Sequence, residues 1–152
     1  MKNPFISAVL CVSVVCAASA AAAEPTEKDA IAMSERGAAF YKAHGKDELL
    51  KHVAAKDPDF VQGAMYIYVR DLATGTNIAH PFNPALVGKD MNDVPDTNGK
   101  FYRREILELA KKSGTGWVDY MYKNPSNGKV EAKTSYVQRV GDVILVTGIY
   151  KK

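Results

Sequence analysis

Cysteine is scarce in this chain of 152 residues, and both cysteines, Cys11 and Cys16, lie within the first 23 residues. The residues after position 23 therefore cannot form a disulfide, supply a thiol nucleophile or bind a metal through sulfur. Histidine is also scarce, because only His44, His52 and His80 are present, and their spacing matches no metal-ligand motif such as H-E-x-x-H. We expect neither a metal site nor a cofactor.

Motifs of known enzyme classes are missing as well. No G-x-S-x-G occurs, and the glycines of residues 114–116 lack the third glycine and the preceding strand of a dinucleotide-binding loop. Segment 94–105 places Asp96 and Glu105 at ligand positions of a calcium loop, but Val94 occupies the first ligand position. We interpret this segment as a turn and a helix start. No catalytic residue is predicted.

A strong excess of one charge is absent. The chain has 20 Lys and Arg residues against 17 Asp and Glu residues, which gives a net charge of +3 at pH 7. This balance argues against nucleic acids and other polyanions as partners. The hydrophobic fraction of 47% and the charged fraction of 24% are those of a globular protein, and the length suits one domain.

The N-terminal residues have the pattern of a secretory signal peptide. A single lysine is their only charge, an apolar stretch covers residues 5–18, and small residues fill positions 17–23. The apolar stretch is shorter than the roughly 20 residues of a spanning helix, which argues against an uncleaved membrane anchor. Cleavage is predicted after Ala20 or, by preference, Ala23. The signal peptide then ends at residue 23, and a periplasmic domain with net charge +2 spans residues 24–152.

The domain is predicted to begin with helices and to end with strands. The strand segments are rich in β-branched and aromatic residues, whereas the last helix has an apolar stripe at Tyr102, Ile106, Leu109 and Ala110. Short links between the strands imply antiparallel pairing. Residues 81–98, with three prolines, form an irregular segment that covers one face. Helices are predicted at residues 24–44, 48–55 and 100–113, and strands at residues 64–70, 76–80, 117–122, 133–140 and 143–150.

A series of short motifs accompanies this element order. The motifs are YIYVRD at 66–71, AHP at 79–81, NPALVGK at 83–89, DTNGK at 96–100, GTGWVDY at 114–120, NP at 124–125, KTSYV at 133–137 and GIY at 148–150. Together they resemble the second type of single Cache domain, the extracellular ligand-binding domain of bacterial chemoreceptors and sensor kinases. The resemblance covers residues 29–150.

This resemblance implies an α+β, PAS-like fold, in which a five-stranded antiparallel sheet carries a long N-terminal helix on one face. A loop and a helix would cover the other face and form a pocket for small metabolites, often short carboxylates. Receptors of the family have a membrane helix on each side of the domain, whereas this chain shows no second membrane helix and no signalling module. We therefore expect a free-standing periplasmic Cache protein.

A pocket for a small carboxylate needs cationic or hydroxyl donors and apolar walls. Tyr66 and Tyr68 share one face of a strand, where they either line the pocket or only pack the sheet. His80 ends its strand and is a candidate donor whose charge would change near neutral pH, the alternative being a turn histidine that binds backbone. Arg103 lies near the apolar stripe and is a candidate for bidentate binding, whereas Arg104 is expected to face solvent.

Four further candidates come from the last three strands. Trp117 and Tyr120 are three residues apart and are expected to face opposite sides of the sheet, so Trp117 is either a pocket wall or, by preference, core. Lys133 begins its strand and Tyr136 faces the other way. The family pattern gives weight to both Lys133 and Tyr136, and the sequence leaves that choice open.

Three functional hypotheses follow from these observations. The first is a soluble periplasmic protein that binds a short organic acid or related metabolite and presents it to a membrane sensor or transporter. The second is an interaction module with an empty pocket, whose long helix forms a homodimer or docks on a receptor ectodomain. The third and weakest is an unrecognised enzyme.

Overall fold

A computed structural model describes residues 23–152, so the signal-peptide prediction falls on residues outside the described part and stays a prediction. No helix within residues 23–152 combines the length and the apolar character needed to cross a membrane. The helices are α1 (Glu27–His44), α2 (Lys46–Ala54) and α3 (Tyr102–Lys112), with a short 3-10 helix η1 (Pro84–Leu86). The strands are β1 (Val61–Gln62), β2 (Met65–Asp71), β3 (Asn77–Ala79), β4 (Thr115–Lys123), β5 (Val130–Val140) and β6 (Val143–Tyr150).

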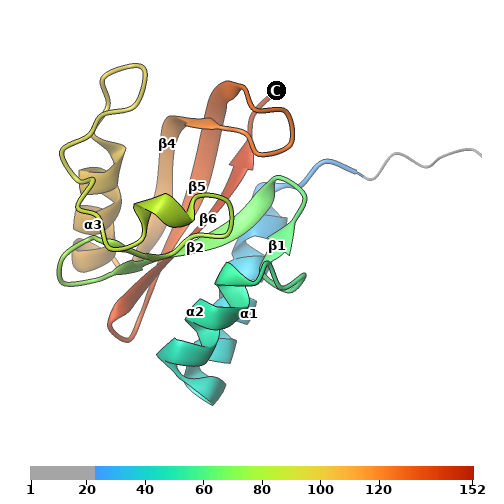
Figure 1. Cartoon of the computed structure of the whole chain (residues 1–152), viewed down its shortest axis with the longest axis vertical. Helices are drawn as coiled ribbons and strands as arrows, with labels where there is room; N and C mark the ends of the chain where they lie inside the picture. The colour runs from blue at the N-terminus through green and yellow to red at the C-terminus, as the bar shows by residue number, and fades with distance from the viewer. Residues whose placement is uncertain (1–22) are drawn as a thin grey trace, which may run out of the picture.

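These six strands form one antiparallel sheet in the order β1-β2-β6-β5-β4, with β3 paired to β2 (Figure 1). The register sets Gly148 of β6 between Tyr66 of β2 and Ser135 of β5, and it pairs Lys133 of β5 with Tyr120 of β4. Residues paired in this way point to the same face of a sheet. All five of these residues therefore share one face.

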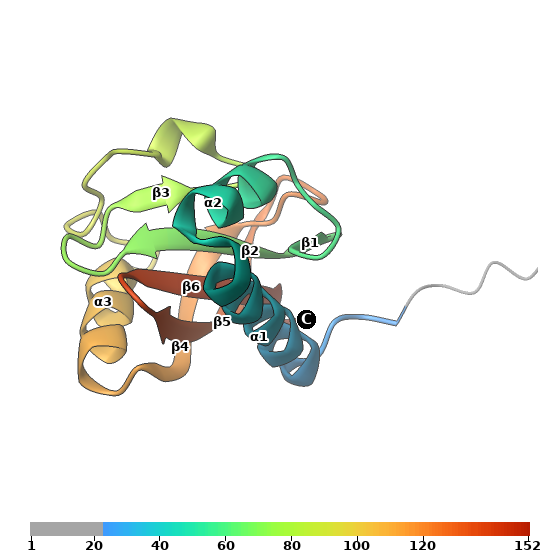
Figure 2. The same cartoon turned by 90° about the horizontal axis from the view of Figure 1, so that it is seen from below.

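Helix α1 packs on the opposite face, as Figure 2 shows. The helix begins with a capping box, in which Thr26 and Asp29 satisfy each other's backbone N–H groups. Four of its five buried residues are small, namely Ala30, Ser34, Gly37 and Ala38, so the helix lies close to the sheet. A methyl group at Gly37 would come within 2.9 Å of Cδ1 of Ile67 and 3.2 Å of Cδ1 of Leu145.

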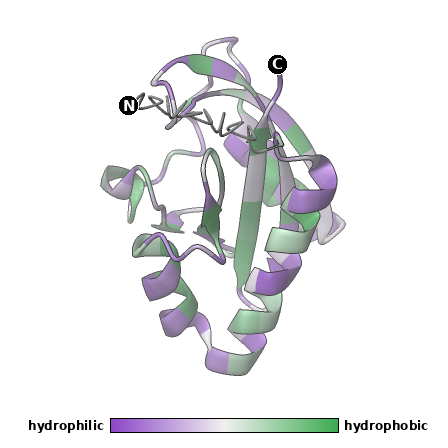
Figure 3. Ribbon diagram, turned by 90° about the vertical axis from the view of Figure 1, so that its right-hand side faces the viewer, coloured by the Kyte–Doolittle hydropathy of each residue, from purple (hydrophilic) through white to green (hydrophobic). Residues whose placement is uncertain are grey.

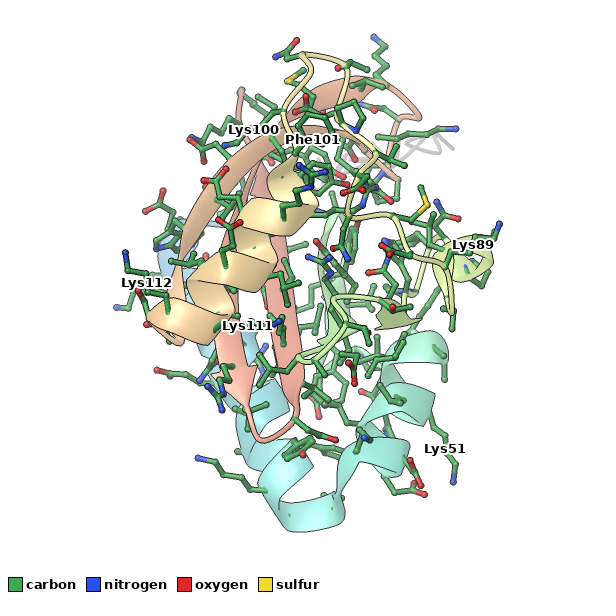
Figure 4. All side chains as sticks on the ribbon, turned by 90° about the vertical axis from the view of Figure 1, so that its left-hand side faces the viewer. Lys51, Lys89, Lys100, Phe101, Lys111 and Lys112 are labelled. Carbon is green, nitrogen blue, oxygen red and sulfur yellow. The ribbon has the colours of Figure 1, made fainter. Side chains whose placement is uncertain are left out.

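Helix α3 and the cover segment, which we define as residues 81–101, lie over the other face of the sheet (Figure 1). Of the predicted stripe, Tyr102, Ile106 and Ala110 are buried there, whereas Leu109 is half-buried. Lys112 projects outward from the end of this helix (Figure 4), whereas Nζ of Lys111 donates to the carbonyl of Ala73 at 3.2 Å. Hydrophobic residues concentrate on the strands, and hydrophilic residues on the outer sides of the helices (Figure 3). The sheet therefore separates two apolar layers, one under α1 and one under α3.

The predicted α+β, PAS-like fold is confirmed, but the sheet has one strand more than expected. The two-residue strand β1 pairs with the start of β2, and its brevity gives no alternation that a sequence pattern could reveal. Strand β5 also begins at Val130, three residues before the predicted start. There the ladder continues from Val130 to Lys123 through pairing with β4 rather than through the β propensity of β5 itself.

Candidate functional site

The sheet face beneath α3 is lined by tyrosines. Alternation along β2 turns Tyr66 and Tyr68 to this face, where both are buried. The rings of Tyr102 and Tyr120 stack in parallel, with their centres 3.9 Å apart. Two more tyrosines from β4 and β6 complete the group. We call the six residues the tyrosine cluster: Tyr66, Tyr68, Tyr102, Tyr120, Tyr122 and Tyr150.

Lys133 ends inside this cluster. Its Nζ lies 3.9 Å from the ring centre of Tyr66, 5.0 Å from that of Tyr150 and 5.3 Å from that of Tyr122. The residue is only 1% exposed, and Nζ has no hydrogen-bond partner among residues 23–152. The Tyr66 hydroxyl beside it is also buried without a partner in this part of the chain. Burial lowers the pKa of Lys133 well below the usual value for lysine.

The charged form of Lys133 is unstable in this environment. Burying an ammonium ion without a counter-ion costs several kcal/mol. The nearest tyrosine ring returns about 2 kcal/mol through a cation–π contact, and the two more distant rings return less. Desolvation therefore outweighs the ring contacts. An anion that reached Nζ would supply the missing charge and the missing hydrogen-bond acceptor.

The position of Lys133 depends on Gly148. A methyl group at Gly148 would overlap Cε of Lys133 and Oγ of Ser135. The absence of a side chain at this point of β6 therefore lets the lysine extend across the strand toward Tyr66. The Ser135 hydroxyl, the polar group next to the lysine, shares a hydrogen bond with the Tyr120 hydroxyl at 2.9 Å.

His80 presents a neutral N–H donor to the same site. Its Nδ1 accepts hydrogen bonds from the backbone N–H groups of Phe82 at 3.2 Å and Asn83 at 3.0 Å, so the ring proton resides on Nε2. That nitrogen lies 3.5 Å from the Tyr122 hydroxyl. The imidazole also stacks on Tyr68, with the ring centres 5.3 Å apart. The local backbone therefore fixes both the orientation and the tautomer of the ring.

The expectation that His80 changes its charge near neutral pH is wrong. Burial, with smaller contributions from Lys133 and Arg103, lowers the pKa of His80 to about 3. The imidazole therefore stays neutral over the physiological range. It can still donate one hydrogen bond to a carboxylate from Nε2.

Arg103 reaches the site from the first turn of α3. The residue is 8% exposed, and its guanidinium lies 4.4 Å from the ring centre of Tyr102. Its Nη1 donates to the backbone carbonyl of Val94 at 3.1 Å. No carboxylate of residues 23–152 accepts from its other donors. Arg104 points outward, as expected, and donates from Nε to Asp93 at 2.7 Å.

A second arginine, Arg70, is fully buried next to Arg103. Its Nε donates to the carbonyl of Gly75 at 2.8 Å, its Nη1 to the carbonyl of Arg103 at 2.7 Å, and its Nη2 to Oδ1 of Asn92 at 2.7 Å. These bonds tie β2 to α3 and to the cover segment. All three acceptors are neutral, so the positive charge of Arg70 is not cancelled by a carboxylate.

The whole site has an excess of positive charge. Within the described strands, Glu131 is the one acidic residue on this face of the sheet. Its carboxylate accepts hydrogen bonds from Asn124 at 2.8 Å and Asn127 at 2.7 Å, which lower its pKa and keep it in the turn after β4. Three basic side chains, Lys133, Arg103 and Arg70, therefore lie under α3 without an acidic partner. In residues 23–152 no three acidic, histidine or cysteine side chains gather in a way that could hold a metal ion.

The interior of the site is nearly filled. A cavity of about 10 Å³, room for one water molecule, lies between His80, Arg103 and four tyrosines of the cluster. Asn77 also lines it, and its buried Oδ1 has no partner among the described residues. An open hollow of about 410 Å³ lies outside, and His80 and Tyr122 line both spaces. A larger open hollow of about 860 Å³, between residues 23–25 and 149–152, contains none of the buried basic groups.

Residues 31–152 match the family described as Single Cache domain 2. The chain belongs to this family. The resemblance seen in the sequence motifs is thereby confirmed.

Two receptors are relatives of this Cache domain. It is 32% identical over 87 residues to the methyl-accepting chemotaxis protein McpP of Pseudomonas putida, covering 56% of this chain and 16% of that protein. It is 29% identical over 126 residues to the sensor histidine kinase MctS of Rhizobium johnstonii, covering 79% of this chain and 26% of that protein. The chain thus spans about a quarter or less of the length of these relatives.

A solved structure has the same fold. It is described as the structural basis for carboxylic acid recognition by a Cache chemosensory domain. It superposes with a TM-score of 0.63 and 26% sequence identity, and the match covers 82% of this chain and 88% of that one. The site therefore lies in a Cache fold, and the family to which the chain belongs consists of sensory ligand-binding domains.

The structure of this Cache domain brings six of the eight predicted site residues together, namely Tyr66, Tyr68, His80, Arg103, Tyr120 and Lys133. Trp117 and Tyr136 lie on the other face of the sheet, with their ring centres 5.3 Å apart, and Trp117 packs against the core under α1. The structure therefore places Lys133 with the other candidate residues and Tyr136 on the opposite face. The sequence had left open which of the two belongs to the candidate site. Alternation along β4 and β5 is the reason.

Sequence reasoning missed several members of the site. Tyr122 lies two residues after Tyr120 and shares its face, so the same alternation could have identified it. Arg70 likewise follows Tyr68 by two residues. Tyr150 and Asn77 gave no such signal, because their places depend on how β6 pairs with β5 and how β3 pairs with β2.

Proposed function

We propose that this Cache domain is a periplasmic ligand-binding protein that binds a short organic acid and presents it to a membrane sensor or transporter. The observation that carries the proposal is Lys133, a fully buried basic group that has no acceptor in the described chain. A buried cation without a partner is costly, and a carboxylate ligand removes that cost. Family membership and the relation to chemoreceptors support a sensory role.

The carboxylate of the acid lies between Lys133 and His80 in this proposal. Both residues contact the Tyr66 ring, Lys133 with Nζ 3.9 Å from its centre and His80 with ring centres 5.4 Å apart. Nζ supplies the charge, and Nε2–H of His80 supplies a directed hydrogen bond. Arg103 adds a second cationic group at the inner cavity. The tyrosine rings form the walls that exclude water from the pair.

The size of the site favours a short acid. The inner cavity of about 10 Å³ has no room for even a two-carbon acid unless a ring moves. Tyr122 lines both this cavity and the outer hollow, and its hydroxyl is 3.5 Å from Nε2 of His80. A rotation of the Tyr122 ring would connect the two spaces. The acid would then enter from the outer hollow with its carboxylate first.

The small cavity also favours a second candidate function. If the rings do not move, the domain is an interaction module with a collapsed pocket that binds a receptor ectodomain or a second copy of itself. The two functions differ in whether any small acid binds. They also differ in whether replacement of Lys133 weakens the binding of an acid.

Thermal unfolding in the presence of acetate, propionate, glycine and alanine tests the proposal. A ligand at a concentration 100-fold above its Kd stabilises the protein by about 2.7 kcal/mol, which raises the Tm by several degrees. We expect this rise with a short acid for the wild type and for Lys151→Met, an exposed lysine that pairs with Asp119 at 2.9 Å. We expect no rise for Lys133→Met or His80→Gln.

Two results would contradict the proposal. An equal rise in Lys133→Met and in the wild type would show that the acid binds elsewhere. No rise with any of the four compounds, together with self-association in sedimentation velocity, would favour the interaction module.

A further inference from the structure

We propose that this domain takes up one proton together with each carboxylate, so that its effective ligand is the undissociated acid. This inference deepens the proposed function and rests on it. The empty site holds Lys133 as a neutral amine, and the bound site holds it as an ammonium ion paired with the carboxylate. The proton comes from solvent, and the site gains no net charge on binding.

The charges around the empty site support this assignment. Lys133, Arg103 and Arg70 are all at most 8% exposed and lie under α3, and none of them contacts a carboxylate in the described chain. Several unpaired cations in one apolar layer repel one another as well as losing their hydration. One of these groups is therefore expected to lose its proton.

The groups that face Lys133 identify it as the one that loses the proton. Its strand neighbours supply Tyr66 from β2, Tyr120 and Tyr122 from β4, and Tyr150 from β6, all with pKa values raised by burial, so they stay neutral. His80 after β3 is neutral as well, and α3 adds the positive charge of Arg103 and the neutral Tyr102. On its own strand, Glu131 is held by two asparagine amides.

The two arginines cannot take this role. An arginine side chain keeps its proton at any pH at which proteins are folded. Arg70 also donates three hydrogen bonds, and Arg103 donates at least one, so their charged forms have acceptors. Nζ of Lys133 has none within residues 23–152. Lysine, moreover, readily becomes a neutral amine when it is buried.

Proton uptake makes the ligand occupancy of the domain depend on pH. Between the pKa of Lys133 in the empty site and its higher pKa in the bound site, occupancy depends on the product of the carboxylate and proton concentrations. That product is proportional to the concentration of the undissociated acid. In this range the Kd for the carboxylate rises tenfold with each unit of pH. The sensor would respond to a weak acid more strongly in acidic than in alkaline surroundings.

Nuclear magnetic resonance of protein with 13C-labelled lysine tests the empty state. The Cε resonance of Lys133, assigned from its absence in Lys133→Met, is expected to be that of a neutral amine at pH 8. The exposed Lys151 in the same sample serves as the internal control. A charged Lys133 at pH 8 in the empty protein would overturn the inference.

Isothermal titration calorimetry with sodium acetate and sodium propionate at pH 7.5, in phosphate and in Tris, tests the coupling. The dependence of the heat on the buffer's ionisation enthalpy gives the number of protons taken up, and we expect about one. Binding with no proton uptake would overturn this inference and leave the proposed function intact. The absence of binding by both acids, seen also in thermal unfolding, would overturn the proposed function and this inference with it.

Discussion

Lys133 and Tyr66 form a buried pair in which neither polar group has a hydrogen-bond partner within residues 23–152. Nζ of the lysine lies 3.9 Å from the centre of the tyrosine ring, and the tyrosine hydroxyl is buried as well. Each group bears a cost of desolvation that no hydrogen bond from residues 23–152 offsets, and the ring contacts return only part of it for Lys133. A protein that keeps such a pair at the centre of its sheet is expected to gain function rather than stability from it.

Replacement of Lys133 by methionine is expected to leave the protein at least as stable as the wild type. Methionine has a similar length and no polar group, whereas Lys133 in the empty site must either bury an ammonium ion or give up its proton, and both cost free energy. Urea unfolding at pH 7 measures the effect. A loss of more than about 2 kcal/mol in the free energy of unfolding would show that the Lys133 amino group makes a stabilising contact.

Substitution of Gly148 by alanine is expected to abolish binding of the acid. The added methyl group would overlap Cε of Lys133, so the lysine would have to leave the Tyr66 ring. Thr147→Ala is the matched control, because Thr147 is the neighbouring residue of β6 and faces α1. Calorimetry with sodium propionate compares the two variants. Equal Kd values in both would contradict the role given to Gly148.

Stability is expected to fall as the pH decreases below 6.5, in part because of His80. Its pKa is about 3 in the folded protein and near 6.5 when exposed, so the unfolded chain binds the proton between these values. At pH 4.5 this linkage removes about 2.5 kcal/mol relative to neutral pH. Urea unfolding at pH 7.0 and 4.5 should therefore show a smaller pH dependence in His80→Gln. The exposed His44→Gln is the control, and an equal reduction in both variants would contradict this account.

Arg70→Met is expected to destabilise the protein by about 3 kcal/mol or more. The change removes three hydrogen bonds and leaves their buried acceptors, including the carbonyls of Gly75 and Arg103, without donors. The exposed Arg104→Met breaks only surface contacts, an ion pair with Asp93 and a cation–π contact with the Phe101 ring, and is expected to have a much smaller effect. Similar losses for the two variants in urea unfolding would rule out a structural role for the buried guanidinium.

Trp117→Phe and Tyr136→Phe are expected to leave the affinity for the acid within about twofold of the wild type. Both residues lie on the face of the sheet under α1, with the strands between them and Lys133. Calorimetry with sodium propionate checks this expectation. A tenfold higher Kd in either variant would show that part of the binding site lies on the face under α1, which would contradict the proposed site.

The sequence predicted the fold well because its signals are local. Alternation in β2 placed Tyr66 and Tyr68 on one face of the strand, and the stripe on α3 placed Arg103 near the buried side of the helix, as the structure has them. What could not be predicted depends on packing between distant segments. The charge state of His80 depends on the burial that the cover segment imposes, and the path of Lys133 depends on the register that sets Gly148 beside it.

The most direct test of the central claim is a crystal structure of the protein grown with sodium propionate. We predict the carboxylate within about 3 Å of both Nζ of Lys133 and Nε2 of His80, with the Tyr122 ring displaced toward the outer hollow. Propionate bound only outside the tyrosine cluster, with Nζ of Lys133 still lying over the Tyr66 ring without an acceptor, would contradict the claim.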